Sequence, residues 1–162
     1  MVDDGRMEWV DLYHHPQEIE RLVAAFYDCS LPQKQWTHYA HLTVGLWHRL
    51  HYGMAEAILR VRFGIQTYNE SCGVKMTPQG GYHETITLFY LWAIGEYLES
   101  AGDDTPLVDL ANGLLNSPLG DRKLPLAYYS RECLFSWEAR VGWIEPDLKP
   151  LEGAPSCTPL PF

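Results

Sequence analysis

The sequence predicts an all-α fold, a single-domain bundle of about five to six helices. The 162 residues suffice for one domain with its own hydrophobic core. Apolar residues recur at helical spacing in several segments, and no segment alternates apolar and polar residues as a half-buried strand would. We expect residues 1–150 to form the helical domain. Residues 151–162 are expected to form an irregular or flexible tail, because prolines recur through residues 146–161.

The first half of the chain predicts three helices. Pro16, followed by acidic residues, suits the first turn of a helix over residues 16–29. Thr37 is a plausible N-cap for a second helix, which ends before Gly53. The third helix runs from residue 54 to about residue 70 and has the clearest 3.6-residue periodicity in the chain, carried by Met54, Ile58, Val61, Ile65 and Tyr68.

The second half predicts three further helices. The helix expected over residues 82–100 is apolar on nearly all sides, which is typical of a helix at the centre of a protein. A shorter helix over residues 105–115 and one more within residues 122–142 complete the set. Because the connections between the second, third and fourth helices are short, we expect these three to pack as an antiparallel set.

Charge and cysteine usage exclude several classes of partner. The formal net charge is −9, from 12 Lys and Arg against 21 Asp and Glu, and no run of basic residues occurs. Binding to nucleic acid or to an anionic membrane surface is therefore not expected. No apolar run approaches the roughly 18 residues that span a bilayer. Four cysteines without a C-x-x-C pair, and an acidic start without a signal sequence, predict free thiols in a reducing cytoplasm. The oligomeric state stays open, with a homodimer possible.

The start of the apolar helix carries the strongest signal for a site. His83 and Glu84 follow the double glycine of Gly80 and Gly81, and both side chains are costly to bury without partners. We predict His83 and Glu84 as catalytic residues. An ordinary explanation exists for Glu84: if Gly81 caps the helix, an acid in the first turn satisfies free backbone N–H groups. That explanation does not account for His83.

Histidines on the second helix predict a metal site. His38 and His41 are three residues apart and so share a helix face, and His83 could supply a third ligand from another helix. Such a set suits a divalent metal, Zn, Fe or Mn, with an open position for chemistry on bound water. The alternative is that the histidine stripe is simply the wet face of an amphipathic helix.

Three further residues are predicted to contact a small-molecule substrate. Tyr68 and Asn69 end the third helix beside a glycine-containing loop, and Tyr82 follows the double glycine. The alternative for Tyr68 is a core position, and for Asn69 a helix C-cap. Arg140 either reaches the pocket or forms a surface ion pair with a neighbouring glutamate.

Several blocks of the sequence carry a resemblance. They are Trp36-Thr37-His38 with His41-Leu42-Thr43, Tyr68-Asn69, Gly81-Tyr82-His83-Glu84-Thr85, Leu134-Phe135-Ser136 and Trp143-Ile144-Glu145-Pro146-Asp147. Through these blocks, over about residues 25–150, the chain resembles a group of bacterial proteins described as hypothetical or of unknown function. The resemblance implies a self-contained bacterial protein and brings no activity, cofactor or catalytic residue. A looser likeness, to small bundles that hold a metal with histidines from different helices, is analogy.

Two functions follow from these observations. The first is a pocket between helices with a His/Glu polar centre, which binds a divalent metal and acts on a small molecule by hydrolysis or oxidation. The second is a non-catalytic helical module that binds a ligand or a protein partner.

Overall fold

The computed structural model describes residues 9–152. This part of the chain forms seven α-helices and three 3₁₀ helices. In chain order these are α1 (Pro16–Tyr27), η1 (Gln33–Gln35), α2 (His38–His51), α3 (Met54–Ser71), α4 (Glu84–Ala101), α5 (Leu107–Leu115), η2 (Pro118–Gly120), η3 (Leu124–Ala127), α6 (Arg131–Leu134) and α7 (Trp137–Val141). The all-α prediction is confirmed, since the described residues contain no strand and one isolated bridge, between Thr77 and Gly80.

Local capping explains where the early helices begin. Thr37 is the N-cap of α2 as predicted, because its hydroxyl accepts a hydrogen bond from the Ala40 N–H at 3.2 Å. Helix α1 begins at Pro16 behind a capping box in which the Glu18 carboxylate accepts from the His15 N–H at 2.9 Å. The predicted bounds of the first three helices therefore agree with the structure to within about two residues.

The prediction of one helix within residues 122–142 is wrong. The chain there forms η3, α6 and α7 instead. Ser130 and Ser136 each cap a new helix with a side-chain oxygen that accepts a backbone N–H three residues on, at 3.1 Å in both cases. Two such caps six residues apart divide the segment, because a serine N-cap has an extended backbone that interrupts a continuing helix.

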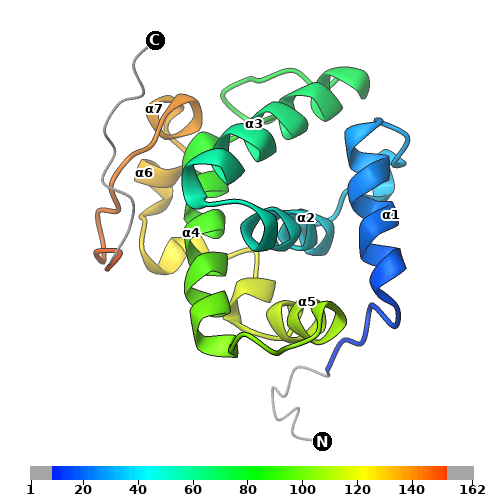
Figure 1. Cartoon of the computed structure of the whole chain (residues 1–162). Coiled ribbons are helices and arrows are strands. Elements are labelled where there is room, and N and C mark those ends of the chain that lie inside the picture. The colour runs from blue at the N-terminus through cyan, green and yellow to red at the C-terminus, as the bar shows by residue number, and fades with distance from the viewer. Residues whose placement is uncertain (1–8, 153–162) are drawn as a thin grey trace, which may run out of the picture.

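Helix α4 is the central element, as its apolar sequence predicts. Figure 1 shows it between α2, α3 and α5 on one side and α6 and α7 on the other, and α4 contacts α2, α3, α5 and α7. Three of its buried residues, Ile94, Leu91 and Phe89, belong to three separate hydrophobic clusters of the core. Helix α4 crosses α2 and α3 rather than running antiparallel to them, so the predicted antiparallel set is not formed.

The end of the described chain packs on the body. Leu151, the first residue of the predicted tail, is buried in the same cluster as Phe89 and Leu134. The rest of that tail beyond residue 152 lies outside the described residues. Among residues 9–152, none of the helices is both long enough and apolar enough to cross a membrane.

Candidate functional site

The candidate site is built around the first turn of α4. His83, rather than Gly81, is the N-cap of this helix. Its Nδ1 accepts a hydrogen bond from the Ile86 N–H at 3.2 Å, and its Nε2 donates to the carbonyl oxygen of Leu134 at 2.7 Å. Burial lowers the pKa of His83, which favours the neutral ring that these two bonds require. Because both ring nitrogens are used by the protein, the ring has no free lone pair for a metal or a proton.

Glu84 follows as the first helical residue and is nearly buried. The guanidinium of Arg62 on α3 donates from Nε to both carboxylate oxygens, at 3.1 Å and 3.0 Å, and also from Nη2. The Tyr82 hydroxyl donates to the same carboxylate. Hydrogen bonding to Glu84 raises the pKa of Arg62, and burial together with the nearby carboxylate raises the pKa of Tyr82. The carboxylate therefore accepts hydrogen bonds from both residues and holds Arg62 and Tyr82 in place.

Arg140 of α7 fixes the backbone just before α4. Its Nη1 donates to the carbonyl oxygens of Gly81 and Tyr82, at 3.0 Å and 3.2 Å, and the residue is only 6% exposed. Its Nε has no hydrogen-bond partner within the described residues. Burial lowers the pKa of Arg140. The sequence offered a surface ion pair for this arginine, and the structure places it inside.

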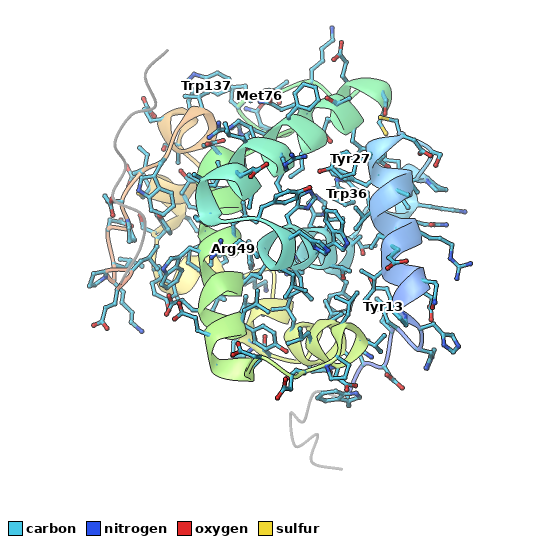
Figure 2. All side chains as sticks on the ribbon, viewed as in Figure 1. Tyr13, Tyr27, Trp36, Arg49, Met76 and Trp137 are labelled. Atoms are coloured by element: carbon cyan, nitrogen blue, oxygen red, sulfur yellow. The ribbon has the colours of Figure 1, made fainter. Side chains whose placement is uncertain are left out.

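A cavity of about 280 Å³ lies between the end of α3 and the loop that returns to α4. Its position depends on Gly81, which has a φ of +88° and lies so close to the loop that a Cβ would stand 2.8 Å from the Met76 Cα. Figure 2 shows Met76 and Trp137 of α7 at this same end of the molecule. The cavity is lined by Gln66, Asn69, Glu70, Gly73, Val74, Lys75, Met76 and Tyr82.

The predicted substrate-contacting residues divide between the cavity and the core. Asn69 and Tyr82 both line the cavity. Tyr68 is 1% exposed, and its hydroxyl donates to the carbonyl oxygen of Leu31 at 2.7 Å, on the side toward α1. Tyr68 therefore occupies the core position that the sequence left as its alternative, and burial raises its pKa to about 12.

The three histidines predicted as metal ligands are not brought together. His38 Nε2 donates to the carbonyl oxygen of Leu119 at 3.0 Å, whereas His41 is exposed, with its Nδ1 donating to the Thr37 oxygen at 2.7 Å. His83 is held by Leu134 in another part of the fold. No group of three or more His, Cys, Asp or Glu side chains within residues 9–152 is arranged to hold a metal ion. The predicted ligand set thus does not form one centre.

Sequence reasoning missed Arg62 as a site residue. It lies on the third helix, 22 residues before Glu84, and the only signal was that a buried carboxylate at Glu84 requires a cation nearby. That requirement gives the residue type of the partner but not its position.

Comparisons of the chain with protein-family models, with curated proteins and with solved structures give no match. The fold and the site by themselves describe an all-α protein with a small cavity beside an Arg–Glu–Tyr network.

Proposed function

We propose that this protein is a non-catalytic helical module that binds a small polar molecule in the cavity between α3 and the loop after it. The observation that carries the proposal is that this cavity holds polar side chains with unused hydrogen-bonding capacity. Gln66 and Asn69 line it, and neither side-chain amide makes a hydrogen bond to another residue of the described chain. A ligand with donors and acceptors would satisfy them.

The size and charge of the cavity narrow the class of ligand. A volume of about 280 Å³ has room for about nine water molecules at roughly 30 Å³ each, so the ligand is small. Glu70 and Lys75 both line the cavity, and one acid with one base suits a zwitterion such as a free amino acid. The side-chain amides of Gln66 and Asn69 would then orient the ligand.

The hydrogen bonds among Arg62, Glu84 and Tyr82 hold one wall of the cavity in place. The Tyr82 ring lines the cavity, and its hydroxyl is fixed by Glu84, which Arg62 holds in turn. A wall fixed in this way loses little conformational freedom when a ligand binds. His83 and Glu84 act here as positioning groups, because their polar atoms are already engaged by the protein. The catalytic role predicted for them from sequence is not part of the proposal.

The setting proposed for this function is a reducing cytoplasm. The three cysteines within the described residues, Cys29, Cys72 and Cys133, are free thiols, and this favours a compartment where thiols stay reduced.

A thermal-shift screen tests the proposed function. The probes are free amino acids, α-hydroxy acids and simple amines at millimolar concentration, added to the full chain. We expect amino acids to raise the midpoint of unfolding and the other two classes, which each carry one of the two charges, to raise it less. Asn69→Ala and Gln66→Ala should each abolish most of the shift.

The matched control is Gln17→Ala, which removes the same amide from an exposed position on α1. It should leave the shift unchanged. The proposal would be contradicted if no probe raised the midpoint, or if the shift were the same in Asn69→Ala as in the unaltered chain.

A further inference from the structure

Two asparagines of α5 contact the segment that precedes α1. The Asn116 side chain accepts the Val10 N–H at 2.6 Å and donates to the Val10 carbonyl oxygen at 2.7 Å. One turn earlier, the Asn112 side chain accepts the Tyr13 N–H at 3.1 Å and donates to the Tyr13 oxygen at 2.8 Å. Each amide therefore binds both backbone groups of one residue, and the segment runs antiparallel to α5.

This pattern is recognition of an extended backbone. The N–H and C=O of one residue point the same way only where the chain is extended, so a planar amide can bind both at once. Asn112 is 4% exposed, and a buried amide without partners would be destabilising. The two asparagines thus require an extended polypeptide along α5.

Among the side chains of residues 9–13, Tyr13 makes most of the contacts with the rest of the fold. Tyr13, labelled in Figure 2, is 7% exposed and packs in the cluster with Leu42 and Leu114. Its hydroxyl donates to the Thr43 hydroxyl at 2.9 Å. Its neighbour Leu12 is 43% exposed. Asp11 adds one contact, as its carboxylate accepts from the Asn112 side chain at 3.0 Å. The surface that the segment covers on Thr43 of α2 and on Asn112 and Asn116 of α5, which we call the α2–α5 groove, therefore contacts a tyrosine and an acid two residues before it.

The hydrogen bonds that cap α1 do not involve residues 9–13. The Glu18 carboxylate caps α1 by accepting from the N–H groups of His14 and His15, both at 2.9 Å. These two histidines are exposed and separate the segment from the helix. Release of residues 9–13 would consequently leave these cap hydrogen bonds in place.

We propose that the α2–α5 groove is a binding site for an extended stretch of a partner polypeptide with an Asp-x-Tyr sequence, and that residues 9–13 are its resident intramolecular ligand. The partner's stretch replaces residues 9–13 on Asn112 and Asn116, and its tyrosine enters the Tyr13 position. The site is separate from the cavity at α3, and its failure would leave the proposed small-molecule function untouched.

Fluorescence polarisation with a labelled synthetic peptide tests this proposal. The peptide has the sequence of residues 9–14, and the protein is the full chain carrying Tyr13→Ala, which weakens the resident segment. We expect the peptide to bind Tyr13→Ala at least about tenfold more tightly than the unaltered chain, where the resident segment competes. Adding Asn112→Ala should weaken binding by about tenfold or more, because three hydrogen bonds are lost.

The matched control is Asp109→Ala, an exposed change on the same helix, which should not alter binding. A peptide with alanine in place of its tyrosine should not bind. A folded Tyr13→Ala protein that fails to bind the peptide, or that binds it regardless of Asn112→Ala, would overturn the proposal.

A second measurement covers the case in which Tyr13→Ala does not fold. Excess peptide is added to the unaltered chain, and the amide signals of Val10 and Tyr13 are followed by nuclear magnetic resonance. Displacement should move both signals to positions typical of a flexible chain, while signals of α1 stay in place. Unchanged signals at saturating peptide would overturn the proposal.

Discussion

Arg62 on α3 and Glu84 at the start of α4 form an ion pair whose carboxylate side is 9% exposed and whose guanidinium side is 27% exposed. The same carboxylate fixes the Tyr82 hydroxyl, so this one pair joins two central helices to the wall of the cavity. An acid so deeply placed depends on its partner, since a buried charge without a counter-charge is strongly destabilising.

Arg62→Met should lower the free energy of unfolding by about 3 kcal/mol, because it leaves Glu84 buried and unpaired. The double variant Arg62→Met with Glu84→Gln should recover most of the loss, since the remaining amide is neutral. Urea unfolding followed by circular dichroism measures both. The control is Arg60→Met on the same helix, whose exposed pair with Glu56 should contribute less than about 1 kcal/mol. Equal losses at the two arginines would refute the prediction.

Gly81→Ala should disturb the cavity as well as the stability. A Cβ at Gly81 would lie 2.7 Å from the Lys75 carbonyl oxygen in addition to requiring a positive φ. Gly73 provides the control, because it also has a positive φ, of +72°, but a Cβ there would meet nothing within 4 Å. We expect Gly73→Ala to cost about 1 kcal/mol and Gly81→Ala about 2 kcal/mol more. Thermal unfolding of the two variants gives the difference.

The sequence predicts helices well here because each signal is local. Apolar spacing and a hydroxyl N-cap at Thr37 act within one or two turns, and they place α2 and α3 almost correctly. The division of residues 122–142 into short helices also depends on local signals, the N-caps at Ser130 and Ser136. A serine in a sequence does not by itself show that it is an N-cap, so these two did not predict the division. The crossing of α4 over α2 depends on side-chain packing between residues that are distant in the sequence. The spacing of apolar residues along the chain does not predict such packing.

The candidate site was only partly predictable for a related reason. Polar residues at the start of an apolar helix drew attention to His83 and Glu84, and both are buried in the structure. Their partners come from elsewhere in the chain: the Leu134 carbonyl oxygen lies 51 residues away and the Arg62 guanidinium 22 residues away. Without knowledge of those contacts, a histidine whose ring nitrogens are hydrogen-bonded within the protein cannot be told from a catalytic histidine by its sequence. For this reason the sequence indicated that these polar groups need partners, whereas it did not indicate which residues supply them.

The stability of the protein should fall in mild acid, in part through His83. Burial lowers the folded-state pKa of His83, and it also lowers those of His38 and His48, below the usual value of about 6.5. As pH falls through about 6.5, these histidines take up protons in the unfolded chain before they do so in the folded one. The free energy of unfolding therefore decreases from about pH 6.5 down to the folded-state pKa of each histidine. Denaturant unfolding between neutral and acidic pH measures this slope.

His83→Asn is the diagnostic variant for that pH dependence. Asparagine keeps a cap acceptor but does not titrate, so the slope should decrease by up to about 1.4 kcal/mol per pH unit. His83→Ala should be less stable at neutral pH, because the cap is lost, and should show the same reduced slope. A slope unchanged in both variants would show that His83 is not buried in its neutral form.

Removal of metal should not change the fold of the untagged protein. Both ring nitrogens of His83 are engaged by the protein, and no group of three or more His, Cys, Asp or Glu side chains within residues 9–152 is arranged to hold a metal ion. We expect a chelator to leave the midpoint of thermal unfolding unchanged, and metal analysis to give much less than one equivalent of zinc, iron or manganese. A stoichiometric metal that is lost in His38→Ala without unfolding would restore the metal site predicted from the sequence.

Helices α1 and α3 approach each other closely at Gly64, and this contact provides a test of the packing itself. A Cβ at Gly64 would lie 2.7 Å from the Phe26 ring, which is 1% exposed and stacked on Trp36 with ring centroids 4.8 Å apart. Since the ring has no space to move, Gly64→Ala should destabilise the protein by about 1–2 kcal/mol despite the better helix propensity of alanine.

The companion variant Phe26→Leu decides whether that loss comes from the contact. Alone, it should be destabilising because it leaves a void beside Gly64. Combined with Gly64→Ala, it should cost less than the two single losses added together, because the new methyl group fills that void. Gly53→Ala is the control, since a Cβ there meets nothing within 4 Å and the φ of −63° suits any residue. Strictly additive losses would mean that Phe26 and Gly64 do not touch.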